Sequence, residues 1–159
     1  MKIILDKNKL KKLINNERNL GFVPTMGAIH EGHISLINRS NKLCKKTIVS
    51  IFINKPQFNK NSDFKKYPRF LNKDIKILKK LNIDYLYLPK EKEIYPNGYN
   101  NNIKISSFKK KLCGKYRPGH FEAVVDVVNN FIKIIKPKII FLGEKDMQQL
   151  VIIKRFLKK

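Results

Sequence analysis

Short apolar segments alternate with amphipathic helical patterns along the chain, and this alternation constrains the fold more than any other feature. The segment Thr47 to Asn54 is an almost continuous β-branched and aromatic run, typical of a strand covered on both faces. Strand-like runs also lie at 3–5, 20–24, 85–88 and 138–142, with a further short strand expected around Ile103 and Ile105. Apolar residues recur with helical spacing after Asp6, over 32–43, 70–82 and 119–136, and again after Gly143. A helical turn is expected at 108–112. This order predicts an α/β fold with a largely parallel sheet.

Length and composition favour one globular domain. The chain has 159 residues, of which 42% are hydrophobic and 30% charged. The first apolar run stops at Asp6 and no run approaches the length of a membrane helix, so we expect a cytoplasmic protein without a membrane partner. Cys44 and Cys113 lie far apart and outside any metal-binding pattern, which argues against a disulfide scaffold and a zinc site.

The net charge of +23, from 35 Lys and Arg against 12 Asp and Glu, raises a second class of function, the binding of nucleic acid or another polyanion. The lysines run from Lys2 to Lys159 without a clustered stripe, and they accompany abundant Ile, Asn, Phe and Tyr, which A/T-rich codons specify. We therefore favour solvated lysines that arose by compositional drift, and nucleic acid is not the expected partner. A polyanion-binding surface stays open as the alternative.

Three segments follow predicted strands and are rich in reactive side chains: 24–33, 54–58 and 143–149. Ligands of parallel α/β sheets bind at the carboxyl ends of the strands, so these segments are the places to search for a site. The sequence therefore predicts that they meet at one edge of the sheet.

The first segment places two histidines, His30 and His33, at a turn that contains Gly27 and Gly32. A helix N-terminus offers free N–H groups and glycines permit close approach, so a triphosphate suits this turn. The alternative is a capped turn with two surface histidines. Zinc is disfavoured, because His120 is the only other histidine in the sequence.

The segment 143–146 repeats this arrangement with one lysine and two carboxylates. Lys145 can face a phosphate, and Glu144 and Asp146 can hold a ribose hydroxyl or a metal-bound water. A helix N-terminal turn that favours acids explains the same residues without chemistry.

Six motifs together resemble the pantothenate synthetase family, the pantoate–β-alanine ligases of coenzyme A biosynthesis. They are PTMGAIHEGH (24–33), SIFINKPQF (50–58), YPR (67–69), IYPNG (94–98), RPGHF (117–121) and GEKDMQQL (143–150), in the family's order. The resemblance implies a Rossmann-like, doubly wound parallel sheet of the nucleotidyltransferase (HxGH) superfamily. It also implies an ATP-dependent ligase that uses Mg²⁺, forms pantoyl adenylate and transfers the acyl group to β-alanine, giving pantothenate, AMP and diphosphate.

The resemblance assigns site residues motif by motif. His30, His33 and Lys145 become the catalytic residues, with His33 the usual proton donor. The ATP site becomes Met26, Gly27, Ala28, Ile29, His30, Glu31, Gly32, His33, Gly143, Glu144, Lys145 and Asp146. The pantoate and β-alanine pocket takes Pro24, Thr25, Gln57 and Gln149, and no protein-held metal site is assigned. A homodimer is implied as well. The RPGHF motif either lies near the site or simply caps a helix, and His120 is not assigned a catalytic role.

Two departures from the family pattern matter. The usual Asn-Pro-x-Gln-Phe loop reads Asn-Lys-Pro-Gln-Phe at 54–58, so that Lys55 takes the restriction that proline places on the preceding residue. Family members also continue beyond the QQL helix into a Met-Ser-Ser-Arg-type phosphate loop and a lid domain. We therefore expect residues 1–159 to be an ATP- and pantoate-binding catalytic domain whose carboxyl-terminal lid domain is absent. A half-enzyme or non-catalytic remnant that binds ATP and pantoate is the alternative to an autonomous enzyme.

Overall fold

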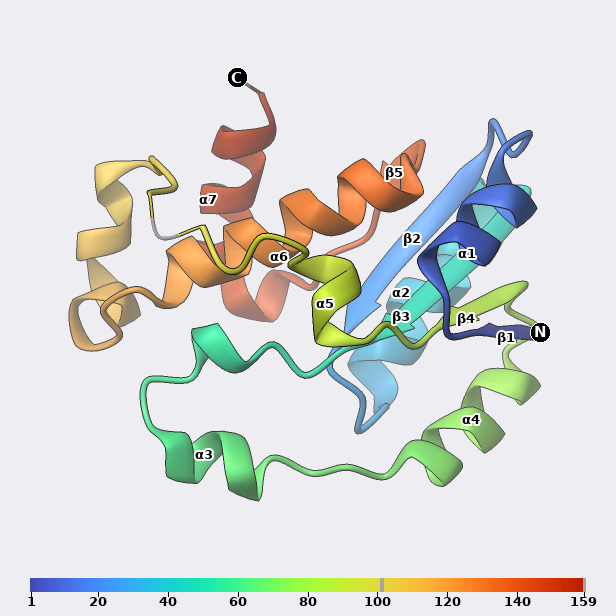
Figure 1. Cartoon of the computed structure of the whole chain (residues 1–159), viewed down its shortest axis with the longest axis horizontal. Helices are drawn as coiled ribbons and strands as arrows, with labels where there is room; N and C mark the ends of the chain where they lie inside the picture. The colour runs from blue at the N-terminus through green and yellow to red at the C-terminus, as the bar shows by residue number, and fades with distance from the viewer. Residues whose placement is uncertain (101, 159) are drawn as a thin grey trace.

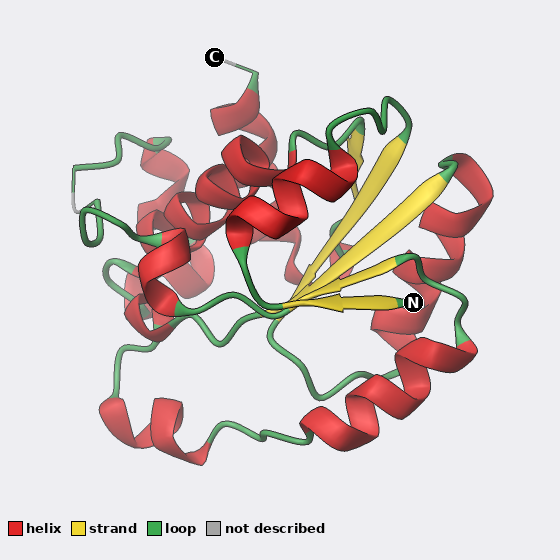
Figure 2. Cartoon of the chain, turned by 45° about the vertical axis from the view of Figure 1, so that its right-hand side comes forward, coloured by secondary structure: helices red, strands yellow, loops and turns green. Residues whose placement is uncertain are grey.

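The computed structural model describes residues 1–100 and 102–158, and its centre is a sheet of five parallel strands. They are β1 (Lys2–Ile4), β2 (Leu20–Thr25), β3 (Lys46–Ile51), β4 (Tyr85–Tyr87) and β5 (Ile139–Ile140), in the spatial order β1-β4-β3-β2-β5. In register, Val23 lies opposite Val49, and Val49 lies opposite Leu86. Figure 2 shows the arrowheads pointing to the same side of the molecule. The predicted Rossmann-like α/β fold is confirmed.

Seven α-helices and four 3-10 turns accompany the strands in the described residues. The helices are α1 (Lys7–Ile14), α2 (Glu31–Leu43), α3 (Asn61–Lys66), α4 (Leu71–Lys80), α5 (Glu91–Ile94), α6 (His120–Ile135) and α7 (Met147–Leu157). The 3-10 turns are η1 (Lys55–Gln57), η2 (Ser107–Lys110), η3 (Leu112–Tyr116) and η4 (Glu144–Asp146). Local chemistry sets the helix ends. The Asp6 carboxylate accepts the Lys9 N–H at 2.7 Å at the start of α1, and α6 ends at Ile135, with Lys136 as its cap directly before Pro137.

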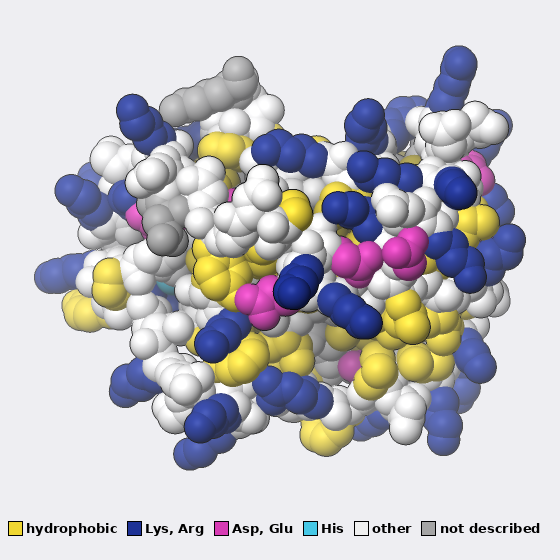
Figure 3. All heavy atoms as spheres, in the orientation of Figure 1, with side chains coloured by type: hydrophobic (Ala, Val, Ile, Leu, Met, Phe, Trp, Pro, Cys, Tyr) yellow, Lys and Arg dark blue, Asp and Glu magenta, His cyan; other side chains and the backbone are white. Residues whose placement is uncertain are grey.

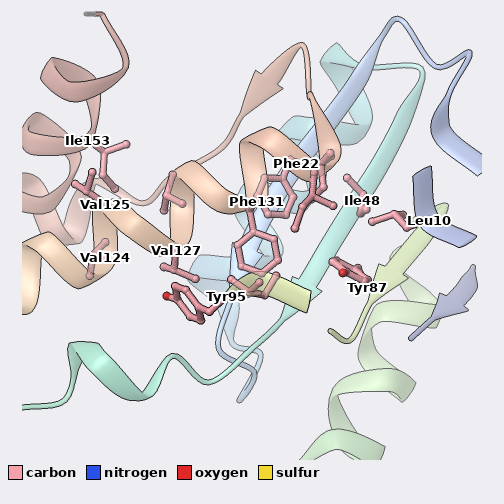
Figure 4. Close-up of a cluster of buried hydrophobic side chains, with 14 of the residues drawn as sticks. Leu10, Phe22, Ile48, Tyr87, Tyr95, Val124, Val125, Val127, Phe131 and Ile153 are labelled. Atoms are coloured by element: carbon pink, nitrogen blue, oxygen red, sulfur yellow. The ribbon is translucent and has the colours of Figure 1, made fainter. Parts of the chain in front are cut away.

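Each face of the sheet carries its own core, as the period of two along the strands requires. Phe22 and Ile48 point to the face covered by α1 and α6, where the ring of Phe22 lies 5.4 Å from that of Phe131. Figure 4 shows this cluster of aromatic and aliphatic side chains. Val23 and Val49 point to the opposite face, which α2 and α4 cover. Burial on both faces explains why the strands read as nearly continuous apolar runs.

The order of the strands creates a topological switch point. The chain moves outward from β2 through β3 to β4, and then returns to place β5 on the other side of β2. A crevice therefore opens between the loops after β2 and after β5, at the carboxyl edge of the sheet. Two of the three segments singled out from the sequence, 24–33 and 143–149, follow these two strands.

Two details of the sequence prediction are wrong. Ile103 and Ile105 form no strand in the described part of this segment; Ile103 is buried against the core and Ile105 packs on it, so their apolar character reflects packing of an irregular segment. The strand expected to reach Asn54 ends at Ile51. The loop at 55–68 contains η1 and α3, and it bows away from the sheet in Figure 1.

The two thiols are free, as expected, and they differ in environment. Cys44 is buried, whereas Cys113 is exposed and donates to the side-chain carbonyl of Gln148 at 2.8 Å. The amide of Gln148 also donates to the backbone carbonyls of Phe108 and Lys111, at 2.9 and 2.6 Å. Gln148 therefore fastens η2 and η3 to α7.

The surface carries cations over many elements. On the face drawn in Figure 3, Lys and Arg side chains are spread across the molecule and do not form one stripe. Among the described residues two ion pairs occur, Lys46–Asp84 at 2.8 Å and Lys109–Glu122. None of the helices that the structure describes combines the length and apolar composition that a membrane span requires.

Candidate active site

A cleft of about 410 Å³ occupies the switch point of the sheet. It is bounded by the end of β2, the start of α2, the loop after β3, one side of α6, and the segment from β5 into α7. Its polar lining combines imidazole, amide, ammonium and carboxylate groups: His30, His33, Asn54, Gln57, Lys145, Asp146 and Gln149. An apolar cleft with a few convergent polar groups is typical of a small-molecule site.

His30 caps the first turn of α2. Its Nδ1 accepts the backbone N–H of Gly32 at 3.0 Å, which places the proton of the neutral ring on Nε2. The ring lies 4.1 Å from that of His33, centroid to centroid. The turn before it uses left-handed backbone at Gly27 (φ 84) and Ala28 (φ 52). His30 thus offers an N–H donor beside the free N–H groups of a helix start, a combination suited to phosphate oxygens.

His33 carries the most perturbed imidazole of the cleft. Its pKa is lowered to about 4: burial of the ring is the largest cause, the neighbouring His30 acts in the same direction, and Asp74 opposes both effects. His33 is therefore neutral at pH 7. Its Nδ1 is buried and has no hydrogen-bond partner within the described residues. Buried polar atoms are normally paired, so this one marks a position where a ligand can supply the partner.

The buried state of His33 predicts that the free energy of unfolding rises with pH between about 4 and 6.5. In that window the unfolded chain binds more protons than the folded chain, so stability is lost as the pH falls. We expect His33→Gln to show a smaller loss between pH 7 and pH 4.5, measured by urea unfolding. An equal loss in both proteins would contradict a buried neutral imidazole at this position.

Asp74 anchors the loop that leads into α2. The sequence did not indicate this role of Asp74. Its carboxylate accepts the N–H groups of Ala28 at 2.9 Å and Ile29 at 2.8 Å, and the side chain is only 2% exposed. A β-carbon on Gly27 would lie 3.0 Å from the same carboxylate. The only signal in the sequence is an acid in the first turn of α4, which every helix favours.

Comparison with known proteins now decides the family. The sequence profile of the pantoate-beta-alanine ligase family matches residues 2–159. The chain belongs to this family. Pantothenate synthetase of Pseudothermotoga lettingae is 41% identical over 161 residues, which cover 99% of this chain and 57% of that protein. Pantothenate synthetase of Acetivibrio thermocellus is 41% identical over 162 residues, covering 99% of this chain and 58% of the relative.

Solved structures of the pantoate–β-alanine ligase family share the fold. The crystal structure of pantothenate synthetase from Thermus thermophilus matches with a TM-score of 0.91 and 32% identity, over 99% of this chain and 57% of that one. The enzyme from Francisella tularensis, crystallised with beta-gamma ATP and beta-alanine, matches with a TM-score of 0.92 and 42% identity, over 99% and 62%. The chain thus spans between one half and two thirds of the length of these relatives.

The structure brings most of the residues assigned from the family motifs into one cleft. The lining includes Pro24, Thr25, Met26, His30, Gly32, His33, Gln57, Gly143, Lys145, Asp146 and Gln149. Five others do not line it: Gly27, Ala28 and Ile29 form the loop held by Asp74, and Glu31 and Glu144 are exposed beside it. The roles given to all of these residues remain proposals.

Several lining residues of this family member were missed from the sequence. An apolar wall comes from α6 and its neighbours: Phe52, Val124, Val127, Val128 and Phe131. The period of 3.6 in α6 predicts an inward face, and the same face serves both the core and the cleft. Asn54 and Tyr67 also line the cleft, and their motifs gave no role that pointed to them.

Proposed function

We propose that this chain supplies the ATP- and pantoate-binding catalytic domain for the condensation of pantoate with β-alanine, over residues 1–159. The observation that carries the proposal is the convergence of His30, His33, Gln57, Lys145 and Gln149 on one cleft at the switch point of the sheet. These residues come from motifs far apart in the chain, and the family profile spans residues 2–159.

The first step joins pantoate to AMP. A carboxylate oxygen of pantoate attacks the α-phosphorus of ATP, the bond to the bridging oxygen breaks, and diphosphate leaves with the electron pair. Negative charge builds on the phosphate oxygens, so the Nε2–H of His30 and the ammonium of Lys145 stabilise it as donors. A triphosphate beside His33 favours the imidazolium form, which allows this residue to donate a proton to the departing diphosphate.

The second step transfers the pantoyl group. The amine of β-alanine attacks the acyl carbon of pantoyl adenylate, loses a proton, and AMP leaves as the C–O bond breaks. Gln57 and Gln149 hold pantoate through amide hydrogen bonds, which add neither charge nor a competing nucleophile. The apolar wall of α6 suits the methyl groups of pantoate and excludes water from the adenylate.

Magnesium fits this site as a companion of the nucleotide. No group of three His, Cys, Asp or Glu side chains capable of holding a metal occurs in the part of the chain that the structure describes, and Asp146 is the one carboxylate lining the cleft. Mg²⁺ is commonly bound by phosphates, waters and one or two carboxylates, where it neutralises phosphate charge. Asp146 is therefore the residue that would hold it.

The similar proteins support the choice of substrates and suggest a second candidate function. The Francisella tularensis structure holds beta-gamma ATP and beta-alanine. The chain covers 57% of the Pseudothermotoga lettingae relative. The second candidate is therefore a module that binds ATP and pantoate without turning them over by itself. We place either form in the cytoplasm, where ATP is available, as a homodimer in keeping with the family resemblance.

Isotope exchange separates the two candidates. The purified chain is incubated with ATP, Mg²⁺, pantoate and labelled diphosphate, and the label entering ATP is measured. An enzyme competent for the first step exchanges label only when pantoate is present. ATP binding by calorimetry without exchange would support the binding module, and a folded chain that binds neither ATP nor pantoate would overturn both.

A further inference from the structure

Two motifs of the chain contribute nothing to the lining of the cleft. Neither IYPNG (94–98) nor RPGHF (117–121) is represented among the cleft residues. One buried side chain from each motif nevertheless reaches the η1 turn that carries Gln57: Tyr95 through Asn54, and His120 directly. Both side chains are almost completely buried, Tyr95 at 6% and His120 at 4% exposure.

Asn54 fixes which end of the Gln57 amide faces the cleft. The Nδ2 of Asn54 lies 3.2 Å from the backbone carbonyl of Ala123 and 3.1 Å from the Oε1 of Gln57. Because a backbone carbonyl can only accept, the end of Asn54 beside Ala123 has to be the amino group. The atom of Gln57 that faces this amino group must therefore be an acceptor, which is the carbonyl oxygen Oε1. The amino group of the Gln57 side chain, Nε2, is then left free to donate into the cleft.

Tyr95 closes this chain of hydrogen bonds from the other side. Its hydroxyl donates to the Oδ1 of Asn54 at 2.7 Å, and Asn54 is only 1% exposed. Figure 4 shows Tyr95 beside Val127 of α6. Without the hydroxyl, the buried Oδ1 loses a partner that water cannot easily replace.

His120 holds the backbone of the same residue. Its Nδ1 lies 2.8 Å from the carbonyl oxygen of Gln57, and since that oxygen can only accept, Nδ1 carries the proton. Burial lowers the pKa of His120, which keeps the ring neutral. His120 is the first residue of α6, so the turn is tied to the helix that forms the apolar wall of the cleft.

We propose that Tyr95 and His120 are positioning residues that aim the Gln57 amide so that it presents its N–H to a carboxylate or hydroxyl oxygen of the bound hydroxy acid. The inference rests on the proposed function, because that function makes Gln57 a ligand of pantoate. It explains how the turn keeps its direction with the proline at position 56. The backbone bond from the Gln57 N–H to Asn54 is long, at 3.4 Å, and only the bond from the Phe58 N–H to Lys55, at 3.1 Å, has an ordinary length, so the two buried side chains add restraint to the turn.

The test measures pantoate affinity of the whole 159-residue chain by calorimetry. We expect Tyr95→Phe and His120→Phe each to weaken binding by about tenfold, the effect of losing one well-aligned hydrogen bond. Tyr99→Phe is the matched control, since the Tyr99 hydroxyl bonds Glu91 at the surface, and it should leave the affinity unchanged. In a Gln57→Ala background, Tyr95→Phe should have no further effect, whereas a residue that merely stabilises the fold would still cost affinity.

A second readout needs no ligand. The side-chain amide resonances of Gln57, identified by their loss in Gln57→Ala, should shift in Tyr95→Phe and stay in place in Tyr99→Phe. Unchanged Gln57 resonances, or a full Tyr95→Phe effect in the Gln57→Ala background, would overturn the positioning role. A wild-type chain that binds no pantoate would contradict the proposed function instead, while the resonances would still decide the role of Tyr95.

Discussion

Replacing His33 by alanine is expected to slow AMP formation from ATP, pantoate and β-alanine by roughly 10²–10⁴-fold, the range of a lost general acid. The neutral ring lines the cleft, has a pKa of about 4 and a buried, unpartnered Nδ1, and is poised to gain a proton when phosphate charge arrives. In the proposed first step, alanine removes both the proton donor and the hydrogen-bond donor to the departing diphosphate. The measurement is the initial rate of AMP release at saturating ATP.

Arg39→Ala is the control for His33→Ala, because Arg39 is an exposed residue of the same helix, outside the cleft. Its rate should equal that of the wild type. Proton uptake on ATP binding, measured by calorimetry in two buffers, should also be smaller in His33→Ala. A loss of rate below threefold with an intact fold would remove His33 from the chemistry.

Asp74→Ala is expected to lower the free energy of unfolding by about 2–5 kcal/mol, since it leaves one buried and one partly buried N–H group unpaired. These are the N–H groups of Ala28 and Ile29, in the loop that sets His30 and His33 at the start of α2. We also expect weaker ATP binding, because the loop loses its anchor. Urea unfolding at pH 7 gives the first quantity and calorimetry the second.

Asp63→Ala is the matched control, because Asp63 occupies the first turn of α3 as Asp74 occupies that of α4, yet it is exposed. It should change the free energy of unfolding by less than about 1 kcal/mol, as expected for an acid at a surface helix start. Equal costs in the two variants would show that Asp74 contributes only through the helix dipole and does not anchor the loop.

Much of the fold follows from periodicity and order. Strands such as Leu20–Thr25 are buried on both faces and therefore read as apolar runs, and α6 shows its inward face in the spacing of Val124, Val128 and Phe131. The rule that ligands bind at the carboxyl ends of strands then selects the segments that line the cleft. The local sequence pattern was sufficient to predict the fold wherever the buried residues followed the period of a single helix or strand.

Contacts between distant segments could not be predicted in this way. The bond from Asp74 to Ile29 joins residues 45 positions apart, and the bond from Tyr95 to Asn54 spans 41 positions. In both bonds, the sequence around one residue does not indicate which distant residue it contacts. Ile103 shows the converse case: it is buried in the core cluster without pairing in the sheet, so this apolar segment was misread as a strand.

The most direct test of the central claim, that this cleft activates pantoate with ATP and passes it to β-alanine, is the release of AMP by the purified 159-residue chain. We predict AMP release that requires pantoate, β-alanine and Mg²⁺ together and that falls in His33→Ala. A folded chain that binds ATP yet releases no AMP with all three present would contradict the claim and leave the binding module as the function of this domain.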